Sequence, residues 1–76
     1  MKTIKMYLLQ RPGRDDDYIS VLDDKINVQS SLLKHMWNDP SKINFKILTF
    51  PYTLETYYGD SNVLEDAVLL WEHNID

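Results

Sequence analysis

The absence of cysteine from a chain of only 76 residues is the feature that most limits what it can fold into. A chain of this length buries about 60% of the surface that its unfolded form exposes, so its margin of stability is small. Without cysteine it cannot form the disulfides that stabilise many small secreted domains, a thiolate nucleophile or a cysteine-based zinc site. We therefore expect residues 1–76 to form one small domain.

The hydrophobic segments are too short for the roughly 20 apolar residues that a membrane span needs. Residues 67–71 form one of the longest of them. Residues 1–9 lack the long apolar region and the small-residue cleavage site of a secretory signal. Together with the lack of cysteine, these features predict a cytoplasmic protein that has no membrane partner.

The N-terminal part of the chain has the pattern of a β-hairpin. Residues 2–10 are rich in strand-forming types and roughly alternate, which predicts a strand whose core-facing residues are Ile4, Met6 and Leu8. Residues 11–16 predict a turn, because Pro12 fixes its own φ and Gly13 allows a positive φ. Residues 18–22 then predict the second strand.

The same region also allows a helical interpretation. Leu22, Ile26 and Leu33 lie at helical spacing, so the alternative is one long helix over residues 16–37. The hairpin is favoured because several residues here are weak helix formers and two aspartates interrupt the middle.

The middle of the chain predicts a helix followed by a strand. A helix from residue 27 or 28 to residue 37 is indicated by the one-sided spacing of Val28, Leu32, Leu33 and Met36. Pro40 ends it. Residues 43–50 alternate and predict a third strand, whereas residues 52–58 form either a fourth, short strand or an extended loop.

The C-terminal part predicts a second helix, over residues 62–73. Asn62 and Glu65 resemble a capping box, and the apolar side chains that follow lie on one helical face, namely Val63, Leu64, Ala67, Val68 and Trp71. The expected fold class is therefore α+β: a small antiparallel sheet of ββαβ order, with or without the short strand, and a C-terminal helix packed on it.

The sequence predicts no catalytic, cofactor-binding or metal-binding residues. His35 is expected to be an ordinary surface residue, and His73 is expected to offset the dipole at the end of the last helix. No phosphate-binding glycine pattern occurs, since the chain has only two glycines. The aspartates at 15–17 and 23–24 do not have the spacing of a calcium-binding loop, so we interpret them as a solvated turn.

The succession of strand, polar turn, strand, short helix and strand over residues 3–50 resembles small phage-encoded proteins. The strands that carry the resemblance are Tyr7-Leu8-Leu9 and Tyr18-Ile19-Ser20-Val21. Several proteins of this shape are compact inhibitors of host machinery, including RNA polymerase and CRISPR complexes. The resemblance rests on strand order and length, and it implies a protein that binds and blocks. It implies no site residues.

The charges are distributed unevenly along the chain, which has a net charge of -4. Residues 1–14 carry four basic residues and no acid, whereas residues 47–76 carry six acids and no Lys or Arg. Such a field favours a basic partner and opposes nucleic acid. Tyrosines crowd together just before the acidic segment. We expect one of the pair Tyr57 and Tyr58 in the core, and the exposed ones to act as interface anchors.

These observations predict a non-enzymatic regulatory or inhibitory domain that binds a basic patch on a larger protein. The predicted partner-binding residues are Tyr52, Glu55, Tyr58, Asp60, Glu65, Asp66 and Glu72. Glu65, Asp66 and Glu72 are expected to form an acidic ridge on the C-terminal helix. The alternative is a nucleic-acid-binding module that uses the outward face of the sheet, where Lys5, Tyr7 and Lys46 would lie together.

Overall fold

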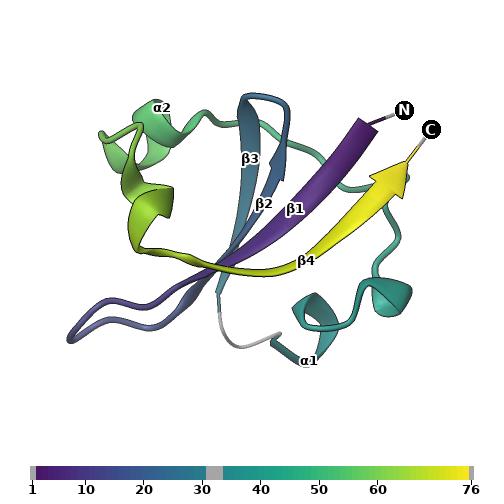
Figure 1. The fold of residues 1–76 in the computed structure, drawn as a ribbon, viewed down its shortest axis with the longest axis horizontal. Helices are drawn as coiled ribbons and strands as arrows, with labels where there is room; N and C mark the ends of the chain where they lie inside the picture. Colours follow the sequence, from purple (N-terminus) through teal and green to yellow (C-terminus); the bar gives the residue numbers. More distant parts are fainter. Residues whose placement is uncertain (1, 31–33, 76) are drawn as a thin grey trace.

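The computed structural model describes residues 2–30 and 34–75 and contains a four-stranded antiparallel sheet with short helical segments (Figure 1). The strands lie in the order β3-β2-β1-β4. Their bounds are β1 (Lys2–Leu9), β2 (Asp17–Leu22), β3 (Lys25–Ser30) and β4 (Val68–Ile75). The helical segments are α1 (Lys34–Trp37), the 3-10 helix η2 (Pro40–Lys42), α2 (Leu54–Tyr58) and the 3-10 helix η3 (Val63–Asp66).

The predicted hairpin is confirmed, and the alternative of one long helix over residues 16–37 is wrong. β1 and β2 pair from Ile4 opposite Leu22 to Leu9 opposite Asp17. β2 then turns directly into β3, with Leu22 opposite Lys25. The two residues between them are aspartates, and Asp23 has a φ of 55°, a left-handed conformation that Asp tolerates better than most residues. The aspartates that interrupt the helical pattern therefore close a second hairpin.

The expected C-terminal helix over residues 62–73 is wrong, and with it the α+β fold class in which that helix packs on the sheet. After η3 the chain extends into β4, which places Lys5 opposite Glu72 and Met6 opposite Trp71. From Trp71 to Ile75 the residues alternate between half-buried and exposed, which is the period of a strand. Pairing with the whole of β1 outweighs the helical spacing of a segment too short to be a stable helix alone.

Two further expectations in the middle of the chain are corrected. The start of the predicted first helix, up to residue 30, belongs instead to β3, and α1 covers only residues 34–37; Leu32 and Leu33 lie outside the described residues. Residues 43–50, expected as the third strand, contain no strand and turn at Asn44, whose side chain accepts a hydrogen bond from the Lys46 N–H. Between α1 and β4 the described residues therefore hold no strand, and the strand order on which the phage-protein resemblance rested is not observed.

Both faces of the sheet are covered, by different parts of the chain (Figure 1). On one face the buried cluster consists of Met6, Tyr18 and Trp37 of α1, with the loop residues Ile43 and Leu48 against it. On the other, Leu9, Ile19 and Ile26 pack with side chains from α2 and η3, which include Leu54, Tyr58, Val63 and Leu64. The short helical segments thus supply the apolar cover that a longer helix was expected to provide.

The expected direction of the β1 side chains is confirmed for Ile4 and Met6, which are 0% exposed. Leu8 is half-buried against the same cluster as Met6. Tyr7 was expected to face outward, but it is half-buried against the second cluster because α2 and η3 cover that face. Lys5 is exposed as expected.

Candidate binding surface

Helix α2 contains two of the predicted site residues, Glu55 and Tyr58, and is flanked by Tyr52 and Asp60, although residues 52–58 were expected as a strand or a loop. Thr53 caps its N-terminus: the Thr53 side chain accepts a hydrogen bond from the Thr56 N–H, and the Thr56 hydroxyl accepts one from the Thr53 N–H. Gly59 ends it in the left-handed conformation, with a φ of 73°. These capping interactions at both ends stabilise a helix of only about one and a half turns, which would be marginally stable by itself.

Two of the tyrosines around α2 are exposed and in contact with each other. Tyr52 is 45% exposed and Tyr57 is 47% exposed, and their ring centroids are 5.2 Å apart. The Tyr57 ring also lies edge-on to Tyr58, with 4.8 Å between centroids. Tyr58 points inward, so the expectation that one of Tyr57 and Tyr58 is in the core and the other exposed is confirmed.

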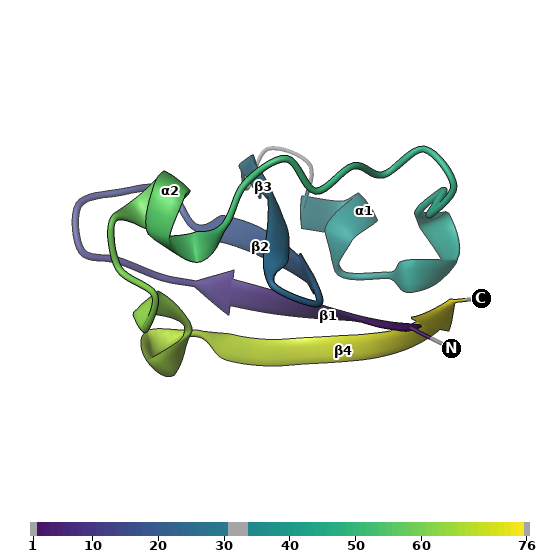
Figure 2. The ribbon, with the colours of Figure 1, turned by 90° about the horizontal axis from the view of Figure 1, so that it is seen from above.

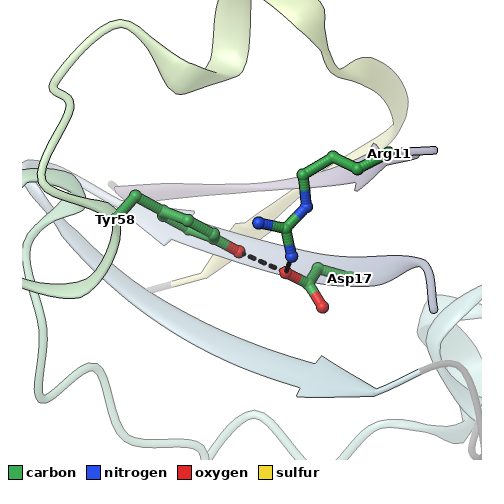
Figure 3. Close-up of polar contacts among 3 residues, drawn as sticks. All are labelled: Arg11, Asp17 and Tyr58. Carbon is green, nitrogen blue, oxygen red and sulfur yellow. Dashed lines mark hydrogen bonds and ion pairs between the residues drawn. The ribbon is translucent and has the colours of Figure 1, made fainter. Parts of the chain in front are cut away.

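The inward tyrosine belongs to a polar cluster with Arg11 and Asp17 (Figure 3). One carboxylate oxygen of Asp17, Oδ2, accepts a hydrogen bond from the Tyr58 hydroxyl at 2.8 Å and another from Arg11 Nη2 at 2.8 Å. The Arg11 guanidinium carbon lies 5.6 Å from the centroid of the Tyr58 ring. Burial, followed by the hydrogen bond to Asp17, raises the pKa of the Tyr58 hydroxyl well above its ordinary value of 10.0. The cluster therefore fixes α2 against the base of the β1–β2 turn.

An open cleft of about 1100 Å³ lies between that turn and α2. It is lined by side chains of both charges and by two rings, namely Arg11, Arg14, Asp15, Asp17, Tyr57 and Tyr58. Neither histidine lines it: His35 is exposed in α1, and His73 stacks on Phe45 at 4.3 Å beside the opposite face of the sheet. The cleft therefore offers aromatic and ionic contacts to a partner.

The predicted acidic residues separate into two places. Glu55 and Asp60 are exposed in and just after α2, and Glu65 and Asp66 are exposed in η3, so these four lie in one stretch of chain. Glu72 lies apart on β4, and its carboxylate is 3.8 Å from Lys5 Nζ. The expected ridge of Glu65, Asp66 and Glu72 does not form, because these residues are not on one helix.

The structure adds three residues that sequence reasoning did not include in the site. Tyr57 replaces Tyr58 as the exposed ring of the pair, and Arg11 and Asp17 form the support beneath it. Contrary to the prediction from the sequence, Asp17 does not belong to a solvated turn, because it begins β2 and its side chain is only 18% exposed. Its contact with Tyr58 joins residues 41 positions apart, so no local pattern signals it.

The alternative site on the sheet is not assembled. Lys5 lies on the face covered by α2 and η3 and is paired with Glu72, and Tyr7 on that face is half-buried. Lys46 lies in a loop beside the opposite face, where Phe45 packs edge-on against Trp71. A stacking platform between two free lysines is therefore not present among these residues.

Within residues 2–30 and 34–75, no three His, Asp or Glu side chains gather in a way that would hold a metal ion. Over the same residues, no helix has the length and apolar character required to cross a membrane. Comparison with protein-family models, curated proteins and solved structures gives no match to this chain.

Proposed function

We propose that this chain is a non-enzymatic regulatory or inhibitory domain that binds a basic patch on a larger protein through the α2 surface. We define the α2 surface as Tyr52, Glu55, Tyr57 and Asp60, flanked by Glu65 and Asp66. The observation that carries the proposal is the pair of exposed tyrosines in contact with each other, in a stretch of chain that has acids but no Lys or Arg from residue 47 onward.

Tyrosines of this kind suit an interface because they offer a large area at a low cost in conformational entropy. Tyr57 is held from below by Tyr58, which is itself held by the bond to Asp17. A supported ring loses little freedom when a partner covers it, so burial of Tyr52 and Tyr57 is expected to slow dissociation.

The acidic side chains are expected to affect the association rate rather than the dissociation rate. Exposed charges of one sign attract a basic surface over a distance of about a Debye length and raise the association rate. Because Glu72 is paired with Lys5 on β4, it is expected to contribute less to this attraction than Glu65 and Asp66. A basic surface covered in this way includes one that otherwise holds nucleic acid, which would make the domain a competitor for that site.

The first prediction tests the tyrosines. The double variant Tyr52→Ala and Tyr57→Ala should fold, because both side chains are half exposed, yet it should bind the partner at least about thirtyfold more weakly. The partner is first captured on immobilised wild-type protein and identified, and affinities are then measured with the purified partner. Ile47→Ala is the matched control, since Ile47 is 76% exposed and lies outside the α2 surface.

Charge reversals complete the same experiment. Glu65→Lys combined with Asp66→Lys should lower the association rate at low salt, whereas Glu72→Lys alone should change it little. Unchanged affinity of the folded tyrosine variant would overturn the proposal. A larger effect of Glu72→Lys than of the η3 pair would show that the acids act elsewhere.

A further inference from the structure

The two edges of the sheet differ in how they are closed. At the β3 edge, the Ile26 N–H donates to the Tyr52 carbonyl at 2.7 Å, and Asn27 Nδ2 donates to the Thr49 carbonyl at 2.8 Å. At the β4 edge, no backbone hydrogen bond to any other described residue is formed on the side away from β1. Figure 2 shows the same contrast: the connection to α2 passes along β3, whereas no ribbon lies beyond β4.

An open edge strand of this length usually carries protection. Natural proteins place Lys or Pro on such strands or cover them, because unpaired N–H and C=O groups recruit other strands. β4 has eight residues without Lys, Arg or Pro, and its first two, Val68 and Leu69, are 55% and 45% exposed. The pairing with β1 shifts register between Met6 and Tyr7, which leaves the stretch from Trp71 to Ile75 regular. β4 therefore presents an edge without Lys, Arg or Pro, and its second half is regular enough for pairing.

A hollow of about 410 Å³ lies beside the second half of β4. Its lining comes from the 43–46 loop and from the strand itself; Ile43, Phe45 and Ile75 are the apolar members, and Asn44, Lys46, His73 and Asn74 are the polar ones. Phe45 stacks on His73, so the loop wall is held against the strand. In strand addition, backbone hydrogen bonds supply affinity and pockets for alternate side chains supply specificity. The hollow provides such a pocket.

We propose that β4 accepts, as an added antiparallel strand, an extended segment of a partner protein with aliphatic side chains at alternate positions and basic residues at the end that reaches η3. The basic end follows from charge, because Glu65 and Asp66 are exposed immediately before β4. A second copy of this chain is a poorer occupant, since residues 47–76 contain no Lys or Arg to meet those acids. This inference rests on the proposed function only for the sign of the partner's charge.

The test uses the full chain, isotopically labelled, and a synthetic peptide of sequence Thr-Val-Thr-Val-Thr-Lys-Lys with both ends blocked. The peptide should shift the amide resonances of Val68–Ile75 and slow hydrogen exchange of the outward-facing β4 amides by about tenfold or more at saturation. The matched peptide has the same sequence with every Thr and Val N-methylated, which keeps the charge but removes the backbone donors. It should bind at least about tenfold more weakly.

Two protein variants distinguish binding of the peptide at the β4 edge from a general effect of added positive charge. Val68→Lys combined with Leu69→Lys should abolish peptide binding, whereas Gln10→Lys combined with Asn38→Lys, the same charge change at exposed positions away from β4, should leave it. The proposal would be overturned if the N-methylated peptide bound as tightly as the unmethylated one, or if both double-lysine variants lost binding equally. It would also be overturned if the resonance shifts centred on α2 or if the peptide caused no shifts at all. The Tyr52→Ala, Tyr57→Ala variant should bind the peptide like the wild type, so the two proposals can fail independently.

Discussion

At the residue scale, Asp17 shows how one carboxylate can join three parts of a small protein. A single oxygen accepts hydrogen bonds from Arg11, near the start of the β1–β2 turn, and from Tyr58, the last residue of α2. Hydrogen bonds to a charged acceptor are each worth about 1.5–3 kcal/mol when little solvent competes. The Arg11 and Tyr58 side chains are thereby ordered next to the cleft, although only Tyr58 was part of the site predicted from the sequence.

The Tyr58 hydroxyl gives a testable pH dependence. The folded state raises its pKa, so the hydroxyl contributes fully below the ordinary value of 10.0, and that contribution is lost as the pH rises from there through the folded pKa. The wild type should therefore lose stability over the first pH unit above 10.0, and Tyr58→Phe should lose less. Urea unfolding followed by tryptophan fluorescence at neutral pH and in this alkaline window measures both curves.

At neutral pH, Tyr58→Phe should be less stable than the wild type by about 1–2 kcal/mol, because Asp17 loses one of its two donors. Tyr57→Phe is the control at neutral pH, since that ring is half exposed and its hydroxyl bonds to no described residue. Equal stability of Tyr58→Phe and wild type, together with parallel pH profiles, would contradict the role given to the cluster.

At the element scale, β4 is the strand that sequence reasoning assigned to the wrong class. Val63, Leu64, Ala67, Val68 and Trp71 do lie at helical spacing, but the alternation from Trp71 to Ile75 has a strand period and falls within the same segment. Short apolar segments are ambiguous by period alone. What decides between them is the open side of β1, which is some 60 or more residues away in the chain and exists only once the sheet has formed.

The parts that could be predicted are those set by local signals. β1, β2 and the turn between them follow from alternation, Pro12 and Gly13, and the end of α2 follows from Gly59. Tyr52 and the acids from Glu55 to Asp66 were placed in the candidate site from composition. Their geometry was not predictable, because it depends on long-range pairs such as Tyr58 with Asp17 and Ile26 with Tyr52.

A substitution at Trp71 tests the attachment of β4 to α1. The Trp71 ring packs against the first buried cluster, and its Nε1–H donates to the Trp37 carbonyl at 2.8 Å. Trp71→Ala should lower the free energy of unfolding by about 3 kcal/mol, a large part of what a domain of this size has. Trp71→Phe keeps most of the ring and should lose only about 1 kcal/mol. Thermal unfolding by circular dichroism checks both, and a cooperative Trp71→Ala transition near the wild-type midpoint would show that β4 is not packed in this way.

At the scale of the whole molecule, opposite charges are matched locally over much of the sheet and left unmatched around α2. Lys2 Nζ lies 3.6 Å from Asp23 Oδ2, and Lys5 Nζ lies 3.8 Å from Glu72 Oε1. Arg11 forms an ion pair with Asp17. The first two pairs are exposed and worth little individually. They affect the electrostatic field of the protein, because Asp23 and Glu72 offset the positive charges of Lys2 and Lys5 on the sheet. Among the described residues, the acids between 55 and 66 have no such ion pair.

The same distribution predicts that stability does not depend on a metal ion. Asp17 is bonded to Arg11 and Tyr58, and within residues 2–30 and 34–75 no three His, Asp or Glu side chains gather where they could ligate a cation together. The melting temperature should be unchanged within error when a chelator is added. Differential scanning calorimetry with and without EDTA measures this, and a fall of several degrees that added Ca²⁺ or Mg²⁺ reverses would contradict it.

The pairing of β1 with β4 has a consequence for the order of folding. Lys2 lies opposite Ile75, so the strand that completes the sheet comes from the far end of the chain, whereas β1, β2 and β3 are joined by short turns (Figure 1). Closing so long a loop costs more entropy than closing either hairpin, and such non-local contacts slow the search for the native state. The three-stranded meander is therefore the natural nucleus, with β4 adding late. Changes in β4 should then act mainly by accelerating unfolding, so the lifetime of the native state depends on its last strand.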